Sequence, residues 1–207
     1  MIAALFGAVS QGILWGVMVL GVYITYKLLN IADLTADGSF AFGGCVCAVM
    51  MVRYGMHPVA ALFFSLTAGM AAGCITGILH TVFEIPVILA GILTQISLWS
   101  VNLRVMGKSN EPLLKLDTIF SSFSRITGLS NSHSSMVLGL VSVICVVAGL
   151  YWFFGTELGS SLRATGNNEA MVKALGINTG FTKLLALMIS NGLIGLSGGL
   201  VMQSQRY

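Results

Sequence analysis

Two aspartates stand out because the sequence around them is almost free of charge. Asp33 and Asp37 lie between the charge-free runs 1–26 and 38–52. An acidic side chain close to a hydrocarbon interior is energetically expensive and is therefore a candidate for function. The plainer alternative is an interfacial turn in which Asp37 caps the helix that follows.

A second pattern that could do chemistry is GLSGG, which matches the G-x-S-x-G motif around a nucleophilic serine at Ser197. Such a serine needs a base, and His80 is the histidine that could approach a membrane serine. Gly192, Gly195 and Gly199 already explain the segment as a packing stripe, so we expect no catalysis and predict that the chain is not an enzyme. No metal-ligand spacing, Walker loop or dinucleotide fingerprint is present, so we expect neither a metal nor another cofactor.

The composition identifies the solvent of the folded chain. Hydrophobic residues make up 56% of the 207 residues, charged residues make up 8%, and the mean hydropathy is +0.92. A soluble domain carries about a quarter charged residues, so most of this surface must face membrane lipid. The formal charge of +3 is small and scattered, which argues against nucleic acid as a partner.

Charge-free runs map the membrane segments. A spanning helix needs about 20 mostly apolar residues, and all but one of the runs are long enough. We predict an all-α fold, a single-domain polytopic membrane helix bundle over 1–207 with about six membrane segments. The first run has no basic residue before it and Lys27 after it, so we expect a retained membrane helix and not a secretory signal. The runs are 1–26, 38–52, 54–83, 85–103, 126–156 and 184–205.

The second segment is expected to be broken. The run 38–52 is too short to span, and extending it back to residue 30 adds polar residues that favour turns over helix interior. We predict an irregular stretch near Asp33 to Gly38 and a half-helix from about Ser39. Irregular backbone at membrane depth is tolerated where it is buried in protein or lines a cavity, and broken helices build substrate sites in transporters. The predicted substrate-pathway residues are Asp33, Thr35, Asp37, Gly38 and Ser39.

Glycines recur at every fourth position in three of the runs. Small residues four apart form a flat stripe that lets helix backbones approach closely in lipid. The sequence therefore predicts a packed bundle, with the pair Gly12 and Gly16 making a similar stripe in the first run. The predicted packing positions are Gly69, Gly73 and Gly77, which follow Ser65, and Gly195 and Gly199.

Two polar connections separate the later runs. The long polar loop 107–135 contains LLKLDTIFSSF, which fits either a short amphipathic helix on the membrane face or a partly ordered external loop. The connection 155–183 is better formed. In it Asn167 or Asn168 can cap a helix start, and Gly176 can end the helix.

The helix expected in the second connection is two turns long and amphipathic. Glu169 and Lys173 stand four apart in the favourable order, and Met171 and Leu175 form an apolar edge. Because so short a helix is marginal in water, it needs a surface to dock against, and we expect a contact site.

Two motifs carry a family resemblance. The pattern R-A-x-G-x-N…A…A-L-G-I-N is matched by Arg163, Ala164, Gly166, Asn168, Ala174, Leu175, Gly176, Ile177 and Asn178, and ADLTADGSFAFGG resembles a second family segment. The chain resembles the membrane permease of ABC importers in the branched-chain amino acid and ribose class. It is most similar to a bacterial group of largely unassigned substrate, some linked to aromatic amino acids. Members are typically longer, so the chain resembles a truncated permease.

The resemblance implies a function and partners. The loop 157–178 would be the cytoplasmic coupling loop that docks on a separate ABC ATPase subunit. A solute-binding protein would deliver a small organic solute, most simply amino-acid-like, to a pore formed with a second permease copy in the bacterial inner membrane. A gradient-driven transporter or channel without an ATPase is the alternative. The implied coupling residues are Arg163, Ala164, Gly166, Asn168, Glu169, Ala174, Leu175 and Gly176.

Basic residues leave the orientation open. If the loop 157–178 is cytoplasmic and all six segments cross, more basic residues lie outside than inside, against the positive-inside tendency. A second segment that dips without crossing would reverse the side of everything before it. The inside set is Lys27, Arg163, Lys173 and Lys183, and the outside set is Arg53, Arg104, Lys108, Lys115, Arg125 and Arg206.

Overall fold

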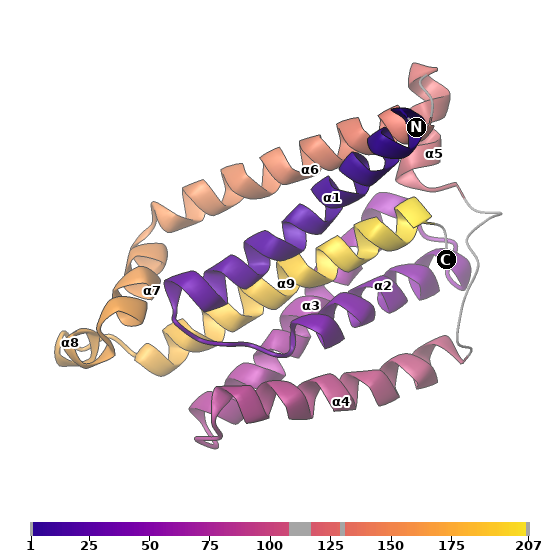
Figure 1. Cartoon of the computed structure of the whole chain (residues 1–207). Helices are drawn as coiled ribbons and strands as arrows, with labels where there is room; N and C mark the ends of the chain where they lie inside the picture. The colour runs from indigo at the N-terminus through magenta and orange to yellow at the C-terminus, as the bar shows by residue number, and fades with distance from the viewer. Residues whose placement is uncertain (1, 108–116, 129–130, 206–207) are drawn as a thin grey trace.

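A computed structural model describes residues 2–107, 117–128 and 131–205, and these form a helical bundle without strands (Figure 1). This confirms the prediction of an all-α membrane bundle. The elements are α1 (Ile2–Tyr23), the π-helical turn η1 (Ile24–Leu28), α2 (Ala36–Val52), α3 (Pro58–Thr81), α4 (Val87–Met106), α5 (Ile119–Thr127), α6 (Asn131–Phe154), α7 (Glu157–Asn167), α8 (Glu169–Ala174) and α9 (Thr179–Gln205).

Five of the helical segments are long and apolar enough to cross a membrane. The sixth apolar helix, α2, is shorter at 17 residues, in line with the prediction that the second segment differs from the others. The protein is thus a multi-pass membrane protein. The five spans are Leu5–Leu28, Pro58–Thr81, Val87–Met106, His133–Phe154 and Thr179–Gln205.

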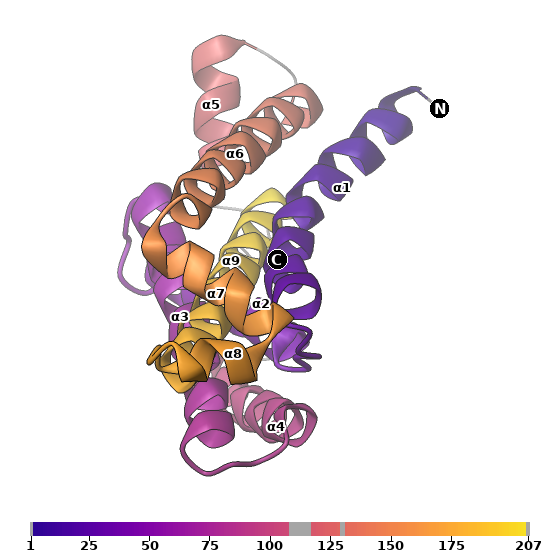
Figure 2. The same cartoon turned by 90° about the vertical axis from the view of Figure 1, so that its left-hand side faces the viewer.

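Helix α9 is the centre of the bundle, with α1, α2 and α3 packed around it (Figures 1 and 2). Helices α3 and α9 approach so closely that a side chain would not fit between them. A Cβ added at Gly69 would overlap the carbonyl oxygen of Asn191, and one at Gly73 that of Leu187. From the other side, a Cβ at Gly195 would lie 2.8 Å from the carbonyl oxygen of Ser65. Further along the same interface, Gly77 meets Leu184 and Gly199 meets the Ser65 side chain.

The stripe expected in the first run does not pack against any of the residues that the structure describes. A Cβ added at Gly12 or Gly16 would meet nothing within 4 Å. The close approach of α1 to α9 occurs instead at Gly21, where a Cβ would lie 2.7 Å from the carbonyl oxygen of Ser190. Spacing identifies small residues on one helical face, but the partner helix decides which of them are used.

The break before α2 is present, with a boundary that differs from the prediction. Residues after η1 are irregular as far as Thr35, and Asn30 has a positive φ of 56°. Helix α2 begins at Ala36, so Gly38 and Ser39 are helical and the expected start near Ser39 was three residues late. The reason is a turn closed by Asp33, whose Oδ1 accepts a hydrogen bond from the Thr35 N–H at 2.8 Å and so sets the chain direction before the helix.

The elements divide between two ends of the bundle (Figure 1). One end holds η1, the turn between α3 and α4, α7, α8 and the start of α9, and the other holds the start of α1, α5 and the C-terminal end of α9. Helix α2 runs in the same direction as α9, since Ser39 bonds to Asn191 and Gln203 bonds to Cys47. It therefore leaves the bundle at the end opposite to η1, which is the geometry of a crossing segment.

Both polar connections contain more helix than expected. In the long connection, α5 begins at its N-cap Thr118 and α6 already begins at Asn131, so the loop is shorter than 107–135. Residues 113–116 of the LLKLDTIFSSF segment lie outside the described residues. The second connection holds α8, as expected, and also α7, which was not expected because its Gly159, Ser160 and Ser161 are poor helix formers.

Candidate functional site

A buried hydrogen-bond network joins the break before α2 to the middle of α9. The Asn191 amide donates to Oδ2 of Asp33 at 2.7 Å and to the carbonyl of Leu187 at 3.0 Å. Its oxygen accepts from the Ser39 hydroxyl at 2.6 Å. Asn191 and Ser39 are fully buried. The network holds one end of α2 onto α9 and satisfies both oxygens of the Asp33 carboxylate.

The position of Asn191 places this network at membrane depth. Asn191 lies 12 residues after Thr179, where α9 begins, which corresponds to roughly 18 Å along an α-helix. The irregular segment 29–35 therefore turns back from the η1 end into the interior of the bundle. Leu29, Ile31 and Thr35 of this segment are buried against the bundle, whereas Asn30, Ala32 and Leu34 are exposed.

A second polar chain holds the same segment from the other side. The hydroxyl of buried Thr35 shares a hydrogen bond of 2.8 Å with that of Thr76 on α3, and Thr76 donates to Thr94 on α4 at 3.0 Å. Thr76 and Thr94 are also buried. Three elements are thus joined by hydroxyl groups, each of which can both donate and accept.

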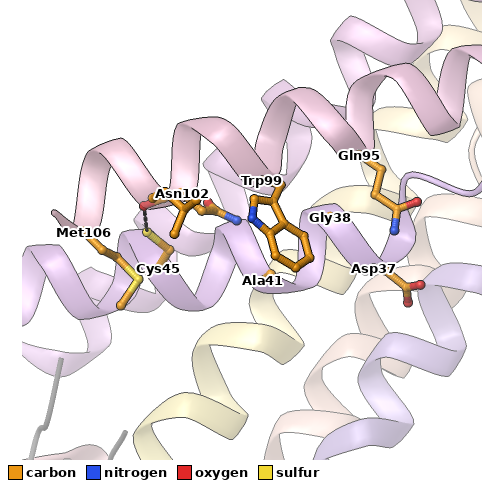
Figure 3. A pocket seen from close by; sticks show the side chains of 9 residues that line it. Asp37, Gly38, Ala41, Cys45, Gln95, Trp99, Asn102 and Met106 are labelled. Atoms are coloured by element: carbon orange, nitrogen blue, oxygen red, sulfur yellow. Dashed lines mark hydrogen bonds between the residues drawn. The ribbon is translucent and has the colours of Figure 1, made fainter. Parts of the chain in front are cut away.

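A cavity of about 310 Å³ lies between α2 and α4 (Figure 3). The two helices run parallel here, so that Gly38 lies against Gln95 and the Cys45 thiol donates to the Asn102 carbonyl at 3.8 Å. Figure 3 shows Asp37 and Gln95 at one end, the Trp99 indole across the middle and Asn102 towards the other end. The lining residues are Asp37, Gly38, Ala41, Cys45, Gln95, Trp99, Asn102, Leu103 and Met106.

The predicted pathway residues therefore fall into two groups. Asp33, Thr35 and Ser39 are bonded inside the protein. Asp37 and Gly38 line the cavity instead, and Asp37 is exposed and enters none of the ion pairs found in the described part of the chain. The first turn of α2 favours a negative charge at this position, since helix N-termini carry partial positive charge.

Helix α7, at the η1 end of the bundle, is held against the membrane helices by contacts with their backbone. A Cβ added at Gly166 would overlap the carbonyl oxygen of Leu28, and the Asn30 amide donates to the Gly166 carbonyl at 3.1 Å. The Arg163 guanidinium donates to the Phe154 carbonyl at 2.7 Å and so satisfies the C-terminal end of α6. These contacts fix α7 against η1 and α6.

Helix α8 is capped and terminated as its sequence predicts. The Asn168 side chain accepts from the Met171 N–H at 3.0 Å, and Gly176 has a φ of +81°. Val172 is buried, whereas Met171 and Leu175 are 58% and 66% exposed. Ala174 is exposed beside them. The helix thus presents an apolar edge that nothing in the described residues covers.

Glu169 ties α8 to the beginning of α9. Its carboxylate accepts from Lys183 at 2.7 Å, pairs with Lys173 at 3.0 Å and accepts from the Thr179 hydroxyl at 3.2 Å. The hydrogen bonds from Lys183 and then Lys173 lower the pKa of Glu169 from 4.5 to about 2. A cavity of about 400 Å³ adjoins this cluster, between α8 and the facing ends of α3 and α9.

Ser197 and His80, the serine and the base of the possible catalytic motif, are far apart. The Ser197 hydroxyl donates to the Leu14 carbonyl at 2.9 Å, and the His80 ring bonds to the Ile85 carbonyl at 3.0 Å. His80 lies beside Thr81, which faces Gly180 at the start of α9. Ser197 lies 17 residues beyond Gly180, roughly 25 Å along the helix. The structure does not bring this serine and this histidine together.

Some residues of the site were not among the predicted pathway residues. Gln95, Trp99 and Asn102 are spaced by four and three, which places them on one helical face, and this spacing was a usable signal. Thr76 and Thr94 carried no signal, since isolated threonines in apolar runs mostly bond to their own helix. Lys183 was likewise not recognised as a partner of Glu169.

Sequence comparison identifies the family. Residues 4–207 match the family model described as "Branched-chain amino acid transport system / permease component". The chain therefore belongs to this family of membrane permeases, which confirms the resemblance to ABC permeases of the branched-chain amino acid and ribose class.

Individual relatives agree with this assignment. The chain is 42% identical over 201 residues to the tyrosine transport system permease protein of Clostridioides difficile, which covers 97% of this chain and 65% of that protein. An uncharacterized protein of Rickettsia prowazekii is 34% identical over 95% of this chain and 66% of its own length. The inner membrane ABC transporter permease protein YjfF of Escherichia coli is 28% identical over 87% of this chain and 54% of its own length. No solved structure matches the chain significantly.

These matches cover only part of each relative. The chain spans slightly less than two thirds of the length of the first two relatives.

Proposed function

We propose that the chain is the permease subunit of an ATP-driven ABC importer that moves a small, amino-acid-like organic solute across the bacterial inner membrane. One of the relatives above is a permease named for tyrosine transport, which supports an amino-acid-like solute. The energy would come from ATP hydrolysis on a separate ATPase subunit, through alternating access of a pore formed with a second permease copy. An extracytoplasmic binding protein would deliver the solute.

The observation that carries the proposal is helix α8. It exposes Met171 and Leu175 at the end of the bundle while Val172 and Glu169 hold it to the membrane helices. An exposed apolar edge on a firmly attached short helix suits a partner that must push or pull on it. We infer that this end is cytoplasmic and that α8 docks in the ATPase.

In this proposal Arg163, Gly166 and Asn168 position α8 and do not themselves contact the partner. Arg163 and Gly166 hold α7 on α6 and η1, and Asn168 caps α8. Ala174 and Leu175 make the contact, and Gly176 ends the helix. Movement of α8 would reach α9 through the pair of Glu169 and Lys183.

The test is purification of the native complex in mild detergent. Wild type is compared with Ala174→Glu plus Leu175→Glu, which places charge on the apolar edge without touching the buried Val172. The matched control is Tyr54→Glu, an exposed residue (70%) at the other end of the bundle. We expect an ATPase to co-purify with wild type and with the control and to be lost from the double variant.

Two outcomes oppose the proposal. If no ATPase co-purifies with any of the three proteins, the result favours the alternative of a gradient-driven transporter or channel. If the ATPase is retained by the double variant, α8 is not the docking helix.

A further inference from the structure

We propose that the cavity between α2 and α4 is a solute-binding site that recognises an ammonium group with Asp37 and a flat apolar group with Trp99. This inference deepens the proposed function and rests on it for the direction of transport. In this site Asp37 binds the ammonium group of the solute and Trp99 its flat apolar group, and no lining side chain binds a carboxylate.

The residues that line the cavity carry one negative charge and no positive charge, which favours a positively charged group on the solute. Asp37 is the one ionisable carboxylate among them, and none of them is basic. A carboxylate at membrane depth without a cationic partner is unfavourable, so a bound ammonium would stabilise it. The cation beside the cavity, Arg53, donates to the Met106 carbonyl at 2.7 Å, at the end away from Asp37, so a solute carboxylate would find no cation near Asp37.

The middle of the cavity provides an aromatic surface. Trp99 is 71% exposed, and its indole lies across the cavity between Asp37 and Asn102 (Figure 3). Indole faces stack on flat apolar groups and also attract cations. Because Ala41 on α2 is small, the chain leaves space opposite the ring.

Asn102 adds a polar side chain to the cavity wall at the end away from Asp37 (Figure 3). Its side-chain oxygen is buried and has no hydrogen-bond partner among the described residues. Buried polar atoms are nearly always paired, and an unpaired one calls for an explanation. The oxygen is enclosed by protein, so a solute in the cavity could contact only the other atoms of this side chain.

The cavity also lies where an importer needs a site. Asp37 lies two residues before Ser39, which bonds to Asn191 in the middle of α9, and Met106 lies at the end of α4 away from α8. The cavity therefore extends from mid-depth towards the end that the proposed function places outside the cell.

The test uses the fluorescence of Trp99 in the purified chain. Replacing the other two tryptophans, in Trp15→Phe plus Trp152→Phe, leaves Trp99 as the sole emitter among the three in the sequence. The protein is kept in micelles of a non-ionic maltoside detergent, which carries no ammonium, and is titrated with phenethylamine, phenylalanine and 3-phenylpropionate, which share a ring and differ in charge. We expect saturable changes with the two amines and at least about tenfold weaker binding of the acid.

Asp37→Asn, which keeps the size of the side chain, should remove the preference for amines. The matched control Asp117→Asn changes an aspartate that is 74% exposed and does not line the cavity, and it should leave the preference unchanged. Equal responses to the three compounds, or a preference that survives Asp37→Asn, would overturn the proposal.

An ammonium could also come from a lipid headgroup, and a second set of micelles with added lipid separates the two sources. Adding phosphatidylethanolamine should leave the titrations unchanged if the site takes a solute. If it abolishes the response to phenethylamine, a lipid occupies the cavity and the solute proposal falls. These measurements need no ATPase, so their failure is distinguishable from failure of the co-purification test.

Discussion

Asp33 and Asp37 are four residues apart in one short segment, yet the fold uses them in opposite ways. Asp33 has both carboxylate oxygens occupied, by the Thr35 N–H and the Asn191 amide. Asp37 is exposed to a cavity and enters none of the ion pairs of the described residues. One acid therefore builds the break before α2, and the other remains available to bind. A membrane acid is a candidate for function only after its internal partners have been counted.

The largest expected loss of stability follows from removing Asn191, the hydrogen-bond partner of Asp33. Asn191→Leu leaves the Asp33 carboxylate and the Ser39 hydroxyl without their interhelical partner in a buried place, which costs roughly 2–4 kcal/mol. We expect a clear fall in the unfolding temperature in detergent, measured by intrinsic fluorescence. Gln95→Leu, which removes an amide from the cavity, is the control and should change stability little. Equal stability of both variants would show that the network is not structural.

Replacing each aspartate with asparagine tests directly whether Asp33 is structural and Asp37 binds solute. Asp33→Asn weakens the charged hydrogen bond from Asn191, and a loss of about 1–2 kcal/mol is expected. Asp37→Asn loses only a charge at the start of α2, so it should lower the unfolding temperature less than Asp33→Asn, and it should lose solute uptake by the reconstituted importer. The comparison between the acids would be wrong if the stability loss appeared at Asp37 and not at Asp33.

The hydroxyl chain behind Asp33 should have a smaller effect. Thr76→Val keeps the shape of the side chain but removes the bonds to Thr35 and Thr94, and interhelical hydrogen bonds in membranes contribute about 0.6 kcal/mol on average. We expect a slight decrease in the unfolding temperature. Thr67→Val, an exposed threonine on the same helix that bonds to the Phe64 carbonyl, is the matched control. A decrease as large as that of Asn191→Leu would contradict the ranking.

A third acid extends the comparison to the surface. Glu169 is paired with Lys183 and Lys173, which lower its pKa to about 2 from 4.5. Because the folded pKa is depressed, its stabilising contribution is complete above pH 4.5 and is lost as the pH falls towards 2. The effect is small, since surface ion pairs are screened by solvent.

Glu169→Gln should therefore lower the unfolding temperature near neutral pH by a small amount and leave wild type and variant equal near the acid end of this range. The measurement is thermal unfolding of both proteins across a pH series. A difference that persists at low pH would assign the role of Glu169 to packing and not to charge.

Local chemistry was sufficient to determine much of this protein. Long apolar runs require membrane helices, so the bundle and its five long spans followed from hydropathy alone. Turn-forming residues around Asp33 predicted the break, and Asn168 and Gly176 predicted the two ends of α8. These features depend on neighbours a few residues apart, which is the range over which sequence patterns are informative.

Only the tertiary structure decided how the polar residues are divided. Asp33 and Asn191 are 158 positions apart, and no local pattern relates them. The same holds for Thr35 and Thr76, and for the parallel alignment of α2 with α4 that places Asp37, Gln95 and Trp99 around one cavity. A hydrogen bond needs its partner within about 3 Å, and whether an acid is satisfied or free is therefore set by which helices the fold places beside it.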